Sequence, residues 1–275
     1  MDAQVNDTSN AASRQSGGAV ESASLMARSL GIAVGQRQLV TELSLEFRRG
    51  EMTAILGRNG SGKTLTLHTL AGLRRPQQGT VRLGGVSLEQ MKRRDVARRI
   101  GLLMQDFEES FTTTALESVL IGRHPHLDPW QWETSEDERI ARESLARVNM
   151  QDFANRTTDA LSGGERRRVA IASLLAQSPQ IFLLDEPTNH LDPQHQLAVL
   201  ELFRALADAG RTVIATLHDP TLAARFSDRV ILLFGDGRWS TGPTRDALNA
   251  DSLSELYLTP MMEIRSDNHR AFVNA

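Results

Sequence analysis

Hydrophobic residues recur along this chain in short buried runs that alternate with helical faces. Apolar or alternating runs typical of strands occupy 25–34, 43–47, 52–56, 100–104, 181–184, 212–217 and 230–234. Helical patterns are expected at 63–73, 164–176, 194–209 and 220–226. Because strands and helices alternate, the chain is predicted to be an α/β protein with a mostly parallel sheet covered by helices.

The strand signals stop between residue 107 and about residue 158. Within this stretch, Ile140, Ala141, Leu145 and Val148 fall on one face of a helix expected at 136–148. The pattern therefore predicts a helical subdomain at about 107–160, inserted in the middle of the sheet.

The two ends of the chain differ from the rest. Residues 1–23 are small and polar, without the apolar core of a signal peptide, and Asp2, Asp7 and Glu21 are not typical of a transit peptide. We expect a disordered N-terminal tail over 1–23, one folded domain over 24–258, and a C-terminal tail over 259–275 whose irregular pattern predicts no element.

Composition narrows the classes of function. No apolar run approaches the ~20 residues that span a bilayer, so a transported solute would have to cross through another polypeptide. The absence of cysteine excludes disulfides, thiolate metal sites and a cysteine nucleophile, and it fits a reducing compartment. A formal net charge of −3 gives no general basic field, so no nucleic-acid partner is expected.

A glycine-rich turn between a strand and a helix fits the pattern G-x-x-x-x-G-K-[ST]. Its residues are Gly57, Arg58, Asn59, Gly60, Ser61, Gly62, Lys63 and Thr64. Glycines let successive backbone N–H groups face inward and bind phosphate oxygens. Lys63 would reach the β- and γ-phosphates of ATP, and the Thr64 hydroxyl would ligate Mg²⁺. A turn that happens to precede Lys-Thr is the alternative, but the strand and helix around it favour nucleotide binding.

Two acidic residues end the apolar strand at 181–184. Asp185 would hold Mg²⁺ through water, and Glu186 would polarise the attacking water. Many strands simply exit into acidic loops, so the pair is informative only because a phosphate loop lies upstream.

A second anion-binding helix start is expected at Ser162, Gly163, Gly164 and Glu165. A chain with two such helix ends but one phosphate loop indicates that the second end serves a partner's nucleotide. Taken alone, L-S-G-G-E fits a helix cap equally well.

Together these motifs resemble those of the ATP-binding cassette (ABC) ATPases, in family order from residue 25 to about 257. The resemblance implies a P-loop NTPase core, an antiparallel β subdomain and an inserted helical subdomain. It also implies that Gln105 senses the metal and links to a membrane subunit, and that His218 contacts the γ-phosphate. Thr66 completes the implied nucleotide set, and 189–192 occupies the D-loop position that contacts the opposing subunit.

Two positions depart from the usual pattern of that family. Val34 stands where many members stack an aromatic ring on adenine, so base selectivity is expected to be loose. Glu165 ends the signature where glutamine is common, which is a frequent variant.

The stretch 122–126 (G-R-H-P-H) follows a T-x-x-E-x-V element at 114–119. This pair resembles the ATPases of importers for cobalamin, ferric siderophores and haem, although Gly and Pro are also common in ordinary turns. The resemblance implies polytopic membrane permease subunits as partners, with a periplasmic or surface substrate-binding protein acting indirectly. It places the chain on the cytoplasmic face of the inner membrane. There, two copies would face head to tail and sandwich ATP between 57–64 of one copy and 162–165 of the other.

Three other classes are weighed against transport. A soluble cassette protein acting on ribosomes shares the D-E-P-T-N-H-L-D run at 185–192, but such proteins usually carry two cassettes. A chromosome or repair ATPase would need a long heptad insertion. A metal-binding regulator is disfavoured because the histidines are scattered and cysteine is absent.

Overall fold

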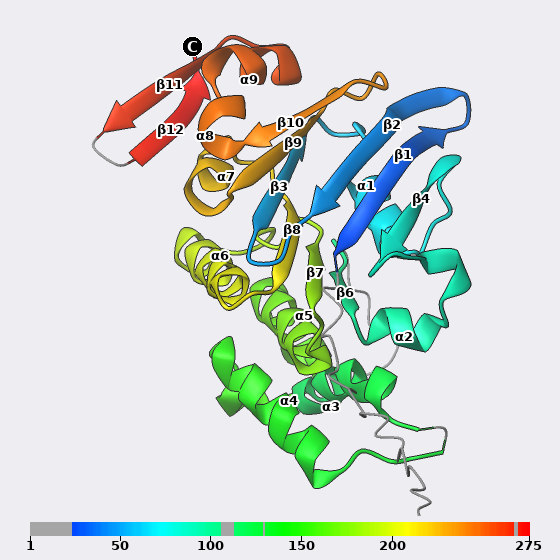
Figure 1. Cartoon of the computed structure of the whole chain (residues 1–275). Helices are drawn as coiled ribbons and strands as arrows, with labels where there is room; N and C mark the ends of the chain where they lie inside the picture. The colour runs from blue at the N-terminus through cyan, green and yellow to red at the C-terminus, as the bar shows by residue number, and fades with distance from the viewer. Residues whose placement is uncertain (1–23, 106–112, 129, 267–268) are drawn as a thin grey trace, which may run out of the picture.

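Two sheets form the frame of the protein (Figure 1). The computed structural model describes residues 24–105, 113–128, 130–266 and 269–275, so the tail expected over 1–23 lies outside the described residues. The first sheet is antiparallel, in the order β2 (Arg37–Phe47), β1 (Leu25–Val34), β4 (Gln78–Leu83), β5 (Val86–Ser87). The second has the order β10 (Trp239–Pro243), β9 (Arg229–Leu233), β3 (Met52–Gly57), β8 (Thr212–Thr216), β7 (Ile181–Leu184), β6 (Ile100–Leu103).

The second sheet is parallel from β9 to β6, and only β10 runs antiparallel to its neighbour. The predicted class, an α/β core with a mostly parallel sheet and an antiparallel β subdomain, is therefore confirmed. The strand expected at 100–104 ends at Leu103, the last residue that pairs with β7, and Met104 is 43% exposed. The strand expected at 43–47 begins earlier, at Arg37.

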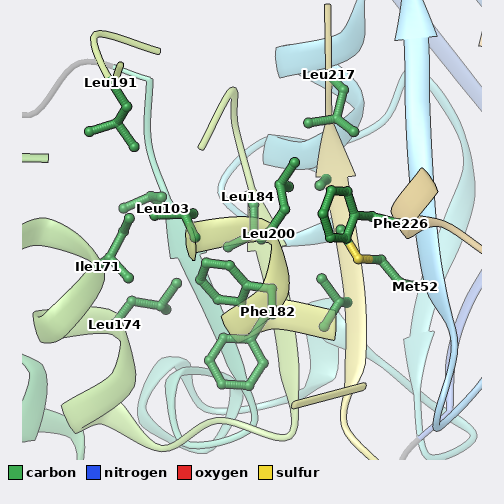
Figure 2. Packing of buried hydrophobic residues seen from close by; sticks show 14 of the residues in the cluster. Met52, Leu103, Ile171, Leu174, Phe182, Leu184, Leu191, Leu200, Leu217 and Phe226 are labelled. Carbon is green, nitrogen blue, oxygen red and sulfur yellow. The ribbon is translucent and has the colours of Figure 1, made fainter. Parts of the chain in front are cut away.

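The parallel sheet separates two hydrophobic cores. Along β7, Phe182 and Leu184 face one core while Ile181 and Leu183 face the other, which is the period of two expected of a strand buried on both sides. Figure 2 shows part of the first of these cores around Phe182 and Leu184. In this core the Phe182 ring packs edge-on against Phe203, with 5.7 Å between the ring centroids. Burying each such side chain contributes about 1.5–3 kcal/mol.

Helices cover both faces of this sheet. The core between the two sheets receives α1 (Lys63–Leu70). The other face is covered by α5 (Gly163–Gln177), α6 (Pro193–Asp208), α7 (Pro220–Phe226) and α9 (Ala250–Tyr257). The short helix α2 (Arg93–Ala97) precedes β6, and the short helix α8 (Thr244–Ala247) leads from β10 to α9. None of the helices within the described ranges has the length and apolar character needed to cross a membrane.

The described part of the inserted region is mostly helical. It contains α3 (Ala115–Leu120), a 3-10 turn at Ile121–His126, α4 (Ser135–Arg147), and 3-10 turns at Gln151–Phe153 and Thr158–Ala160. The helix predicted at 136–148 matches α4 within one residue, and Ala141 and Leu145 are fully buried. The subdomain boundary near residue 107 lies outside the described residues.

The 3-10 turn at Ile121–His126 closes the C-terminal end of α5. A Cβ on Gly122 would lie 2.1 Å from the Ser173 carbonyl oxygen, so only glycine allows this approach. Arg123 Nη1 donates to the Ala176 carbonyl at 2.8 Å, and His126 Nε2 lies 2.9 Å from the Gln177 carbonyl. The Arg123 guanidinium is a cation at the C-terminus of α5, where it interacts favourably with the helix dipole. The 3-10 turn at Ile121–His126 thus attaches the helical subdomain to the end of α5.

The buried ion pair between Arg123 and Asp137 makes this attachment sensitive to acid. Arg123 Nε lies 2.9 Å from Asp137 Oδ1. Burial raises the pKa of Asp137, but hydrogen bonds from Thr134 and Arg123 outweigh it and lower the pKa to about 2. Because the folded pKa is below the unfolded one, the stabilisation is present above about pH 4 and is lost as the pH falls towards 2.

Replacing Asp137 with asparagine should lower the free energy of unfolding at pH 7 by about 1–3 kcal/mol, because Arg123 would lose the charge of its partner. Urea unfolding measured from pH 7 to pH 2 should also show a smaller loss of stability below pH 4 than in the wild type. Asp152→Asn, at an exposed position of the same subdomain, is the control. Equal pH profiles for Asp137→Asn and the wild type would contradict this account.

The segment expected to be an uninterpretable tail contains a strand pair. β11 (Met261–Ser266) pairs with β12 (His269–Asn274), and Phe272, 6% exposed, packs into the core beside α7. The Phe272 N–H donates to the Thr221 hydroxyl at 3.1 Å. This hairpin and the helical subdomain lie at opposite ends of the molecule (Figure 1). The division of the chain at residue 258 stays a prediction.

Candidate functional site

The turn between β3 and α1 has a backbone that only glycine adopts easily. Gly60 and Gly62 have φ angles of 74° and 102°. A Cβ on Gly57 would lie 2.4 Å from the Ser61 hydroxyl and 2.6 Å from the Leu233 carbonyl. The sequence therefore folds here into a tight loop that leads directly into the N-terminus of α1, as a phosphate-binding loop requires.

Lys63 begins α1 and is held against this loop. Its side chain is 6% exposed, and Nζ donates to the Gly57 carbonyl at 2.9 Å. Burial lowers the pKa of the Lys63 ammonium, while Glu186 and Asp185 act in the opposite direction. The ammonium is therefore placed between the loop and two carboxylates, where it can bind an anion.

The two carboxylate oxygens of Asp185 have different surroundings. Asp185 is fully buried at the end of β7, and Oδ1 accepts a hydrogen bond from the Thr216 hydroxyl at 2.7 Å. Oδ2 is buried and lacks a hydrogen-bond partner among the described residues, as does Ser61 Oγ. A buried carboxylate oxygen is unfavourable without a donor or a cation. Together with the Thr64 hydroxyl, this oxygen set fits Mg²⁺, which prefers few carboxylates and keeps water or phosphate ligands.

Glu186, the residue after Asp185, has a strained backbone and a side chain that two other side chains hold in place. Its φ of 48° is unusual for a residue other than glycine. Oε1 lies 2.5 Å from His218 Nε2, and Asn189 Nδ2 donates to Oε2. Glu186 is 6% exposed, and its contacts with His218 and Asn189 set the direction of its carboxylate.

Most of these residues meet at one cavity of about 700 Å³. The predicted site residues that line it are Val34, Asn59, Gly60, Gly62, Lys63, Thr64, Gln105, Glu186 and His218. The size suits a nucleotide. Four other predicted site residues are not part of the cavity lining, namely Gly57, Arg58, Ser61 and Asp185. Thr66 does not line the cavity, since it is fully buried and its hydroxyl donates to the Gly62 carbonyl at 2.8 Å within α1.

The end of the cavity near Val34 contains a residue that sequence reasoning missed. Val34 is 54% exposed, and Arg37, its partner across the β1–β2 turn, lines the cavity with Leu39. Arg37 Nη2 donates to the Gly235 carbonyl at 3.0 Å. No local signal marks Arg37, because its role depends on the distant loop after β9.

The predicted signature lies away from this cavity, at the start of α5. Ser162 and Glu165 form a capping box, in which Ser162 N–H donates to Glu165 Oε2 at 2.7 Å and Glu165 N–H donates to Ser162 Oγ at 3.3 Å. The hydrogen bonds from Ser162 lower the pKa of Glu165. Gly163 is exposed with open space around its Cα. Within one subunit, the helix start is thus exposed and does not contribute to the cavity.

The D-loop position 189–192 has contacts both with the cavity and with the signature at the start of α5. Asn189 reaches Glu186, while a Cβ on Gly164 would lie 3.3 Å from the His190 carbonyl. Asp192 caps α6 by accepting the His195 N–H at 2.9 Å. No group of three or more His, Cys, Asp or Glu side chains suited to a metal occurs in the described part of the chain.

Comparisons with known proteins agree with this geometry. A family model described as ABC transporter matches residues 40–189. The chain is 37% identical over 235 residues to the iron(3+)-hydroxamate import ATP-binding protein FhuC of Bacillus subtilis, covering 85% of this chain and 87% of that protein. It is 39% identical over 234 residues to the hemin import ATP-binding protein HmuV of Streptomyces coelicolor, covering 84% and 82%.

A solved structure is also similar. An inward-facing conformation of a putative metal-chelate type ABC transporter superposes with a TM-score of 0.81 at 30% identity, covering 92% of this chain and 98% of that one.

Proposed function

The chain belongs to the ABC transporter family, and from this membership we propose that it is the ATP-binding and ATP-hydrolysing subunit of an importer for a metal chelate. The cargo class, a ferric siderophore, haem or cobalamin, comes from relatives named for the import of such compounds. The single observation that carries the catalytic part is the cavity where the phosphate loop meets Gln105, Glu186 and His218.

Each residue at the cavity has a task that its position suits. The loop N–H groups and the Lys63 ammonium bind the β- and γ-phosphates. Glu186 orients the attacking water, and His218 contacts the γ-phosphate while keeping the carboxylate in place at 2.5 Å. Thr64, Gln105 and Asp185 would hold Mg²⁺, which supplies charge neutralisation at the phosphates.

Neither half-site alone surrounds a triphosphate, so we propose that two copies act head to tail. The exposed helix start at Ser162–Glu165 of one copy would complete the phosphate donors around the ATP bound by its partner. ATP then drives closure because it binds the closed pair better than the open one. Hydrolysis and phosphate release return the pair to the open state.

Ser162→Arg should leave ATP binding to the phosphate loop within about threefold of the wild type and abolish ATP-driven dimerisation, because the bulky cation fills the space meant for the partner's phosphate. Nucleotide titration and light scattering with ATP measure the two effects. Ser240→Arg, at an exposed position of β10, is the control. Dimerisation of the Ser162→Arg variant on ATP would contradict the composite site.

We further propose that the subunit is peripheral to the cytoplasmic face of a membrane, bound to polytopic permease subunits at the surface around residues 122–132. In that stretch Trp130 and Trp132 are 100% and 85% exposed, and Trp is enriched at protein interfaces. A substrate-binding protein would act on the permeases from the other side.

The test is co-purification of the tagged protein from detergent-solubilised native membranes, followed by identification of its partners. A polytopic partner, with ATPase activity stimulated by a chelate-loaded binding protein, is the expected result. A Trp130→Ala/Trp132→Ala double variant should lose the permease while retaining ATP binding. Recovery of ribosomes instead would overturn the transport proposal and leave the ATPase chemistry intact.

A further inference from the structure

Arg167 is a buried cation between the signature and the catalytic carboxylate. It lies on α5 shortly after Ser162–Glu165, and it is only 6% exposed. Its neighbours in sequence differ from it, since Arg166 is exposed and Arg168 donates to the Val148 and Asn149 carbonyls of the helical subdomain. Of the three consecutive arginines, Arg167 is the one that points into the sheet.

The guanidinium of Arg167 joins the ends of two neighbouring strands. On the β7 side, Nη2 donates to the carbonyls of Asp185 at 2.6 Å and Glu186 at 2.7 Å. On the β6 side, Nη1 donates to the Met104 carbonyl and, at 3.2 Å, to the Gln105 carbonyl. The planar group presents its donors in a rigid fork. The guanidinium therefore links α5 to both strand ends through hydrogen bonds.

Arg167 contacts Glu186, a residue whose backbone is strained. The residue has a φ of 48°, a conformation that persists only where the surroundings hold it. The Glu186 N–H donates to the Thr216 hydroxyl at 2.8 Å, and Arg167 holds its carbonyl from the other side. The direction of the carboxylate that orients water depends on both contacts.

We propose that Arg167 is a positioning residue that couples the signature of a subunit to the Gln105–Glu186 pair of the same subunit. This inference rests on the proposed function. When Ser162–Glu165 engages the partner's ATP, the start of α5 moves, and Arg167 carries that movement to the residues that act on the subunit's own ATP. The two ATP sites of the dimer thereby depend on each other.

Arg167→Gln in the full-length protein tests the coupling through steady-state ATPase kinetics. The turnover number should fall about 10-fold to 100-fold, because a small misplacement of a catalytic group has this effect. The Hill coefficient for ATP should fall from a value above 1 towards 1. The KM and the affinity of the phosphate loop for ATP should stay within about twofold, since the hydrogen bonds of Arg167 described above go to the ends of β6 and β7.

Matched variants separate positioning from a general structural role. Arg204 on α6 is likewise a multiple donor, to the Gly50 and Phe226 carbonyls and to Asp208 and Asp228, but it has no contact with the cavity. Arg204→Gln should lower the thermal midpoint and leave the turnover number and Hill coefficient unchanged. Arg167→Lys should recover part of the turnover but not the cooperativity, because one ammonium cannot join both strand ends.

A folded Arg167→Gln protein with wild-type turnover and Hill coefficient would overturn the inference. If that variant does not fold, Arg167→Lys provides the same test with a smaller loss. Wild-type protein that neither binds ATP nor dimerises on it would refute the proposed function instead, so the two failures are distinguishable.

Discussion

Replacing Glu186 with glutamine is expected to lower ATP turnover by roughly 10²–10⁴-fold, the usual contribution of a group that takes a proton from the attacking nucleophile. Glutamine has nearly the same shape, and its amide can still meet His218 or Asn189, which hold the carboxylate in the structure. The phosphate loop is unchanged, so ATP affinity should stay within about twofold. Bound ATP would persist, and the closed dimer should accumulate.

Single-turnover hydrolysis and gel filtration with ATP and Mg²⁺ measure these effects. Glu201→Gln is a suitable control, because this exposed carboxylate on α6 has only a loose pairing with Arg225 at 3.7 Å. Steady turnover near the wild-type rate in Glu186→Gln would remove Glu186 as the residue that orients water. A dimer that fails to form would instead point to a role for Glu186 in closure.

Lys63→Ala is expected to abolish tight ATP binding. The Lys63 ammonium is buried beside the loop, and each charge-assisted hydrogen bond it makes to a phosphate contributes about 1.5–3 kcal/mol. Loss of one or two such bonds lowers affinity about 10-fold to more than 1,000-fold. The Gly57 carbonyl also loses its donor, so the loop itself becomes less ordered.

Isothermal titration with ATP gives the affinity directly, and transport into vesicles should be lost in parallel. The other lysine of the sequence, Lys92, is exposed before α2 and supplies the control Lys92→Ala. Unchanged ATP affinity in Lys63→Ala would refute the assignment of the phosphate loop.

The catalytic side of the cavity could be predicted from the sequence because its signals are local. Lys63 and Thr64 follow a glycine pattern between a strand and a helix, and Asp185 and Glu186 end an apolar run whose bounds match β7. Likewise, β1 and α7 begin and end where the pattern places them.

The remaining features depend on contacts between distant segments. Arg167 is one of three consecutive arginines, and only the fold shows which of them turns towards β6 and β7. The strand pair β11–β12 exposes the apolar side chains of Met262, Ile264 and Val273, whereas its buried Phe272 packs beside α7. Thr66, which lies close to the phosphate loop in sequence, is predicted to contact the nucleotide. Its hydroxyl instead donates to the Gly62 carbonyl at the start of its own helix.

The position of β3 in its sheet has a consequence for protein synthesis. Both neighbours of β3 come from the last third of the chain, since it pairs with β8 and β9, and Met52 N–H bonds to Asp228 across 176 residues. At ~5–20 residues per second, a ribosome needs about 10–35 s to cover that interval. During this time the apolar strand that precedes the phosphate loop has no strand beside it. A nascent chain halted before residue 212 should therefore bind chaperones and gain no stability from ATP.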